Sequence, residues 1–169
     1  MSLSDAELNA ILFDLAKGYA TAAQEALRDR LVAIALYGSV ARGQAGPASD
    51  IDLFVVLDDA PPGMLARRRL LDPVREALTP DLERLWVQAI YADFVEVIRT
   101  RAEARRFHPL YLDMSLEAVL LYDRDQFLER LLERVGELLK RGGAERHVVG
   151  DFWYWDLNQT FADGEVAEL

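Results

Sequence analysis

Two short and almost entirely apolar runs stand out along the chain, at residues 31–37 (LVAIALY) and 51–57 (IDLFVVL). Runs that are apolar at successive positions are typical of strands covered on both faces of a sheet. Similar runs at 94–98 and 118–122 predict a third and a fourth strand. We therefore expect a sheet whose central strands are buried.

Apolar residues at helical spacing surround these strands. They predict a helix that begins near Ser4-Asp5, and Gly18 is expected to interrupt it before a second helical stretch that runs to about Arg30. Further helices are predicted over 64–78 with a restart at Asp72-Pro73, over 81–91, and over 125–141, where Gly142-Gly143 ends an amphipathic stripe.

This order of elements indicates an α/β (α+β) fold, a mixed sheet flanked by helices. We expect one domain over residues 1–122. The remaining residues, 123–169, hold an amphipathic helix and an aromatic-rich tail that should pack on the same domain.

Composition narrows the class of function. The chain has 169 residues, of which 51% are hydrophobic, and it has no cysteine. Disulfides and thiolate metal sites are thereby excluded, and a cytoplasmic location is expected. The net charge of −10 disfavours nucleic acid as a partner, because phosphate neutralisation supplies most of that affinity. No apolar stretch approaches the length of a membrane span, so no membrane partner is expected.

The chemistry lies between the first two strands. Gly38 and Ser39 follow the first apolar run, and Asp50 and Asp52 open the second. Because side chains alternate along a strand, the two carboxylates share one face and can hold one divalent cation together. Magnesium binds through a few carboxylates and substrate phosphates, so this pair beside a glycine turn predicts a nucleotide site.

The segments 36–43 (LYGSVARG) and 49–53 (SDIDL) resemble the signature of the nucleotidyltransferase family that shares the polymerase-β palm, above all its minimal, single-domain branch. The resemblance implies a palm-like sheet. It also implies a magnesium-dependent enzyme that moves a nucleoside monophosphate from a nucleoside triphosphate, with ATP favoured, to a hydroxyl acceptor.

The resemblance also implies residue roles. Gly38, Ser39 and Arg42 would hold the phosphates, and Asp50 and Asp52 would hold the metal. A third carboxylate on a later strand would complete the metal site and activate the acceptor. Glu96, in the strand FVEVI, is the first candidate for this catalytic and metal-binding role, with Asp93 and Asp113 as rivals; an outward-facing Glu96 is the structural alternative.

The acceptor stays open. The resemblance implies either a partner protein, as in antitoxin-type members, or a small molecule such as an aminoglycoside. A degenerate palm that only binds nucleotide or protein is the alternative from another class, and an oligomer is compatible with the leucine-rich helices.

Three other features have simpler explanations. Arg67-Arg68-Arg69 is expected to be a solvated helix face, and neither His108 nor His147 is a good metal-ligand candidate. The aromatic cluster at 152–155 (FWYW) is expected to be a terminal strand that packs on the domain, although it could also stack a base or contact a partner.

Overall fold

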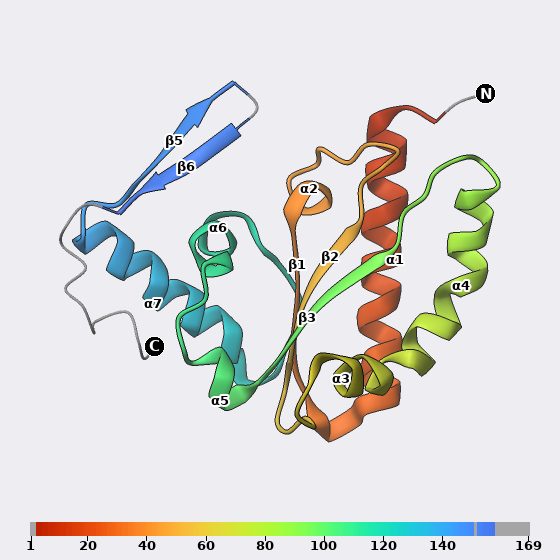
Figure 1. The fold of residues 1–169 in the computed structure, drawn as a ribbon, viewed down its shortest axis with the longest axis horizontal. Coiled ribbons are helices and arrows are strands. Elements are labelled where there is room, and N and C mark those ends of the chain that lie inside the picture. Colours follow the sequence, from red (N-terminus) through yellow and green to blue (C-terminus); the bar gives the residue numbers. More distant parts are fainter. Residues whose placement is uncertain (1–2, 151, 158–169) are drawn as a thin grey trace.

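A four-stranded sheet in the order β3-β2-β1-β4 forms the centre of the protein (Figure 1). The computed structural model describes residues 3–150 and 152–157. The strands are β1 (Leu31–Tyr37), β2 (Ile51–Leu57), β3 (Phe94–Thr100) and β4 (Val119–Asp123). β2 and β3 run parallel, whereas β1 is antiparallel to both β2 and β4. The predicted mixed sheet of an α+β protein is confirmed.

One face of the sheet is covered by α1 (Asp5–Leu27) and α4 (Asp72–Trp86), with the short α3 (Met64–Leu70) beside them (Figure 1). Ile51, Leu53, Val55 and Leu57 of β2 point into this first core. α1 starts with a capping box between Ser4 and Glu7, so its first backbone N–H groups are satisfied.

The other face is covered by α5 (Arg101–Ala104), α6 (Leu110–Glu117) and α7 (Phe127–Arg141) (Figure 1). Phe54 and Val56 of β2 point into this second core, where they meet Tyr111 of α6 and the apolar stripe of α7. Because both faces are covered, β1 and β2 read as continuous apolar runs.

A separate hairpin of β5 (Glu145–Val149) and β6 (Phe152–Asp156) follows α7 and lies beyond α6. The remaining elements are α2 (Gly38–Ala41) and two 3-10 turns, η1 (Arg28–Arg30) and η2 (Arg124–Gln126). Within the described residues, no helix is long and apolar enough to cross a bilayer.

Two helix boundaries differ from the sequence expectation. α1 continues through Gly18, where a Cβ would lie 3.3 Å from Leu78 Cδ2 of α4, so this glycine permits close helix packing and does not end the helix. α4 likewise continues through Pro80 to Trp86, because Leu82 and Leu85 are buried against the first core. No separate helix therefore forms over 81–91.

Candidate active site

The turn after β1 and the second aspartate of β2 are in direct contact. Tyr37 pairs with Asp52 across the two strands, and the chain then turns at Gly38 with φ of +76°. A Cβ at Gly38 would lie 2.3 Å from Oδ2 of Asp52. Glycine is therefore required twice, for the left-handed backbone and for the carboxylate that lies against it.

Asp50 and Asp52 occupy the mouth of β2 on the face that carries Phe54. Asp50 is exposed and Asp52 is half-buried. Burial, and then the Asp50 carboxylate, raise the pKa of Asp52, whereas Arg42 lowers it. Burial and the charge of Asp52 also raise the pKa of the neighbouring Tyr37 to about 12. Two carboxylates that repel each other in this way favour a cation between them.

The loop between α2 and β2 is held by hydrogen bonds that sequence patterns did not reveal. The Ser39 hydroxyl donates to Ser49 Oγ at 3.1 Å, and Ser49 Oγ accepts the Gly46 N–H at 2.9 Å. Asn9 of α1 accepts the Ala45 N–H at 3.0 Å. The sequence shows only that Asn9 is a polar residue next to the apolar stripe of its helix, and this does not indicate which group it binds. These bonds fix the turn beside Asp52.

Arg42 closes the turn and is held by the hairpin. Its guanidinium carbon lies 4.7 Å from the ring centroid of Trp153. Its Nε donates to Gln44 Oε1 at 3.0 Å, and its Nη1 donates to Glu117 Oε1 at 3.4 Å. The cation is thereby positioned near the two aspartates by stacking and by an ion pair.

The aromatic tail packs on the domain through α6. The Asp113 carboxylate accepts the indole N–H groups of Trp153 and Trp155, at 3.0 and 2.9 Å. Arg146 of β5 lies 3.7 Å from the same oxygen of Asp113. Asp113 therefore anchors the hairpin, and this role occupies the residue that the sequence offered as a rival third acid.

The structure contradicts the expectation that Glu96 joins the two aspartates. In the parallel β2–β3 ladder, Glu96 pairs with Leu53, so it lies on the face covered by α1 and α4. Its fully buried side chain accepts the Tyr19 hydroxyl at 3.0 Å and Arg75 Nη1 at 2.6 Å. Glu96 is thus a partner in a buried ion pair on the opposite side of the sheet.

The position of β3 beside Asp52 is Val95. Asp93 stands at the entrance of β3, where its carbonyl accepts the Ile51 N–H at 2.8 Å and its carboxylate accepts the N–H of Phe94. Within the described residues, no group of three His, Cys, Asp or Glu side chains is placed to hold a metal ion. Asp50 and Asp52 still fit magnesium, because this ion is usually bound by one or two carboxylates together with phosphate oxygens of the substrate.

Comparison with known proteins points to one family. Residues 21–109 match the model of the nucleotidyltransferase domain. The putative protein adenylyltransferase MJ1305 of Methanocaldococcus jannaschii is 30% identical over 113 residues, which cover 67% of this chain and 73% of that protein.

Two solved structures are more distant. A toxin–antitoxin crystal structure with AMP-PNP is 19% identical and covers 75% of this chain and 92% of its own, with a TM-score of 0.46. A structure of the tri-AMPylated Shewanella oneidensis HEPN toxin in complex with MNT antitoxin is 15% identical and covers 78% and 92%, with a TM-score of 0.40.

Proposed function

The chain belongs to the nucleotidyltransferase domain family, and from this premise we propose that it transfers AMP from ATP to a hydroxyl group of a partner protein. The transfer of a nucleotidyl group follows from the family. The adenine base and the protein acceptor are the proposed parts, and the name of the 30% identical relative, a protein adenylyltransferase, supports them.

The contact between Gly38 and Asp52 carries the proposal. The turn at Gly38 and the carboxylate of Asp52 lie against each other: a Cβ built on Gly38 would be 2.3 Å from Asp52 Oδ2. A triphosphate bound at the turn would therefore have its oxygens beside Asp50 and Asp52. This is the arrangement that a metal-assisted displacement at phosphorus needs.

Each residue of the site has a proposed task. Gly38 lets the phosphates approach the backbone, and Ser39 presents its hydroxyl and backbone next to them. Arg42, held against Trp153, would add a positive charge to the same phosphates. Asp50 and Asp52 would hold magnesium, which when bound supplies neutralisation of the charge that develops on the phosphate oxygens.

The reaction balances as a displacement at the α-phosphorus. The acceptor oxygen forms a bond to this phosphorus, the bond to the bridging oxygen of pyrophosphate breaks, and the hydroxyl proton leaves to solvent. Val95 of β3 lies beside Asp52, and Asp93, two residues earlier, shares the face of Val95 by strand alternation. Of the two candidates for the third acid in or next to β3, Asp93 is therefore the one on the side of the two aspartates.

ATP labelled at its α-phosphate or at its γ-phosphate tests the proposal. With magnesium and an extract of candidate acceptor proteins, the α-label should become protein-bound and the γ-label should leave as pyrophosphate. Wild type should add protein-bound α-label above that of the extract alone, whereas Asp52→Asn should add none, which controls for other enzymes in the extract. Protein-bound γ-label that wild type adds beyond the extract alone would contradict nucleotidyl transfer, and equal α-labelling by Asp52→Asn would contradict the site.

A further inference from the structure

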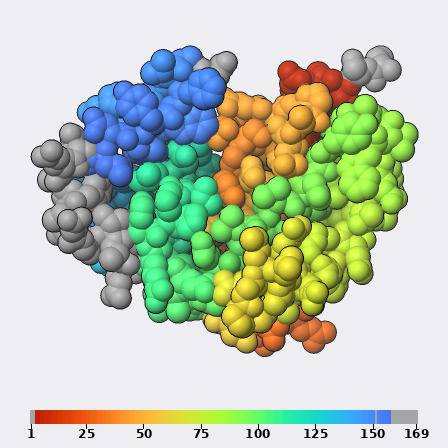
Figure 2. All heavy atoms as spheres, in the orientation of Figure 1, coloured from red at the N-terminus to blue at the C-terminus, as the bar shows by residue number. Residues whose placement is uncertain are grey.

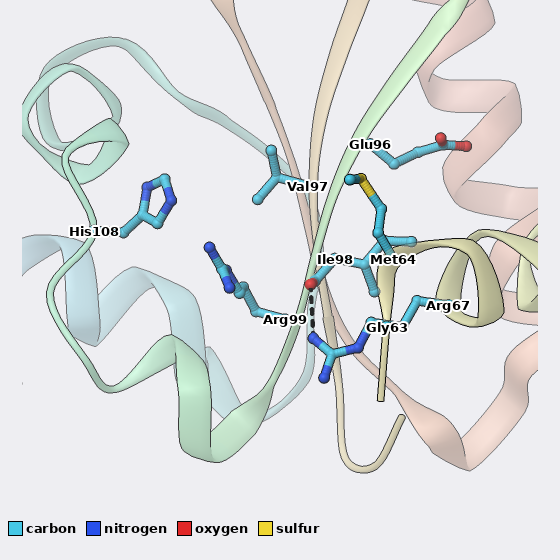
Figure 3. Close-up of a pocket in the computed structure, with 8 residues that line it drawn as sticks. All are labelled: Gly63, Met64, Arg67, Glu96, Val97, Ile98, Arg99 and His108. Atoms are coloured by element: carbon cyan, nitrogen blue, oxygen red, sulfur yellow. Dashed lines mark hydrogen bonds between the residues drawn. The ribbon is translucent and has the colours of Figure 1, made fainter. Parts of the chain in front are cut away.

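A cavity of about 410 Å³, apart from the site around Asp52, lies across the outer edge of β3 (Figure 3). Its lining comes from α3 and the turn before it, from β3, and from the loop before α6: Gly63, Met64, Arg67, Glu96, Val97, Ile98, Arg99 and His108. Figure 2 views the molecule from this edge, with β3 between the yellow α3 and the teal α6. None of these residues belongs to the site around Asp52.

Two nitrogen donors point into the space on the α6 side of β3. Arg99 and His108 lie on this side, whereas Glu96 points the other way, toward α1 (Figure 3). Within residues 3–150 and 152–157, the guanidinium of Arg99 makes no hydrogen bond and no ion pair within 4 Å. Its charge helps to lower the pKa of Glu103, but that carboxylate is already bound by Arg67.

His108 is oriented to donate. Its Nδ1 accepts the Leu110 N–H at 3.2 Å, so in the neutral ring the proton is on Nε2. The ring packs edge-on against Phe54 at 6.4 Å and lies 6.0 Å from the ring of Tyr111. Burial, and then the charge of Arg99, lower the pKa of His108, which keeps the ring neutral at pH 7 with one donor available.

Arg67, the other cation of the cavity, is already occupied. Its guanidinium donates twice to Glu103, at 2.7 and 2.8 Å, and also to the carbonyl oxygens of Pro61 and Ile98. These bonds hold the Arg67 side chain in place over the unpaired edge of β3. The donors left for a ligand are those of Arg99 and His108.

The cavity lies further along β3 from the position beside Asp52. Val95 pairs with Asp52, and Arg99 follows four residues later on the same face of β3. At roughly 3.3 Å per residue, the two positions are about 13 Å apart along the strand. The floor between them is apolar, since Val95 and Val97 stand there, and Val95 is 42% exposed. An extended chain of about four residues spans this distance.

We propose that this cavity binds an oxyanion of the acceptor, a carboxylate or a phosphate group, between Arg99 and His108. The paired N–H groups of the Arg99 guanidinium and the imidazole N–H of His108 can donate hydrogen bonds to the oxygens of such a group. The term acceptor rests on the proposed function, but binding of the anion does not depend on it. An acidic group about four residues from the modified hydroxyl would thus select the acceptor.

Inorganic phosphate, titrated while the ring signals of His108 are followed by NMR, tests the proposal. The samples are wild type, Arg99→Gln, Arg99→Lys and Arg69→Gln, each with and without a non-hydrolysable ATP analogue and magnesium. Arg69 is exposed and lies outside the cavity, so its variant makes the same change of charge elsewhere.

Wild type and Arg69→Gln should show a saturable shift at His108 that persists with the analogue. Arg99→Gln should weaken phosphate binding by at least about tenfold, the value of one hydrogen bond to a charged group. Arg99→Lys should bind between these limits because it keeps the charge and loses the fork.

Either of two results would overturn the proposal: no saturable shift in wild type, or unchanged phosphate binding in Arg99→Gln. A third is loss of the His108 shift when the analogue binds, because it would mean that the nucleotide occupies the cavity. The Gly38 amide signal reports analogue binding in the same samples. A silent Gly38 beside a responsive His108 would count against the proposed function while supporting the anion cavity.

Discussion

Replacement of Glu96 by alanine separates a structural role for this residue from a catalytic one. The side chain is fully buried and pairs with Arg75 at 2.6 Å and with the Tyr19 hydroxyl at 3.0 Å. Removing one partner of a buried ion pair costs about 3–5 kcal/mol. Arg75 also contacts Asp72 and the carbonyl of Arg68, and its side chain is 19% exposed. We therefore expect the lower end of that range, about 3 kcal/mol.

For a chain of this size, a loss of about 3 kcal/mol lowers the melting temperature by roughly 6–12 °C. Thermal unfolding followed by circular dichroism measures this change. Glu76→Ala, on the exposed side of α4, the helix that carries Arg75, is the control and should change stability by less than about 0.5 kcal/mol. Magnesium-dependent ATP binding by Glu96→Ala, measured well below its melting temperature, should match wild type.

The reverse pattern would refute this reasoning. If Glu96→Ala melts with wild type but no longer binds ATP with magnesium, Glu96 acts at the nucleotide site. The face assigned to it by the β2–β3 register would then be wrong.

Three further predictions concern the two sites. Asp52→Asn should abolish transfer. Burial and Asp50 raise the pKa of Asp52, so the charged carboxylate destabilises the fold above that pKa. The variant should therefore be at least as stable as wild type at pH 7. That advantage should shrink as the pH falls through the raised pKa, as denaturant titrations at several pH values would show. Gly38→Ala, at φ of +76°, should lose about 1–2 kcal/mol and displace Asp52, with loss of ATP binding by calorimetry. Arg99→Gln should raise the pKa of His108, measured by NMR titration, and an unchanged value would place the two side chains too far apart.

The turn and its aspartates could be predicted because the pattern that encodes them is local. Gly38 follows one apolar run, and Asp50 and Asp52 open the next, so strand alternation alone puts both carboxylates on one face. The contact of Asp52 with Gly38 then follows from pairing two neighbouring strands.

The position of Glu96 could not be predicted because it depends on register. A shift of one residue moves a side chain to the other face of a strand, and a run such as FVEVI, apolar on both sides of its glutamate, does not indicate which face is which. The partners that decide the matter, Tyr19 and Arg75, lie 77 and 21 residues away along the chain.

The hairpin shows the same limit. The aromatic run of β6 was predicted as a strand, but its partner β5 is a polar segment, ERHVV, with no strand pattern. The bonds from Trp153 and Trp155 to Asp113 span 40 and 42 residues. Only the folded chain brings Trp153 to Arg42 and so links the tail to the turn after β1.

Calorimetric titration of ATP into wild type and into the Asp50→Asn/Asp52→Asn double variant, with and without magnesium, tests the central claim most directly. The account predicts saturable binding that requires magnesium in wild type and is lost in the double variant. Binding of equal strength in the double variant, or in wild type without magnesium, would contradict a nucleotide site built on Asp50 and Asp52.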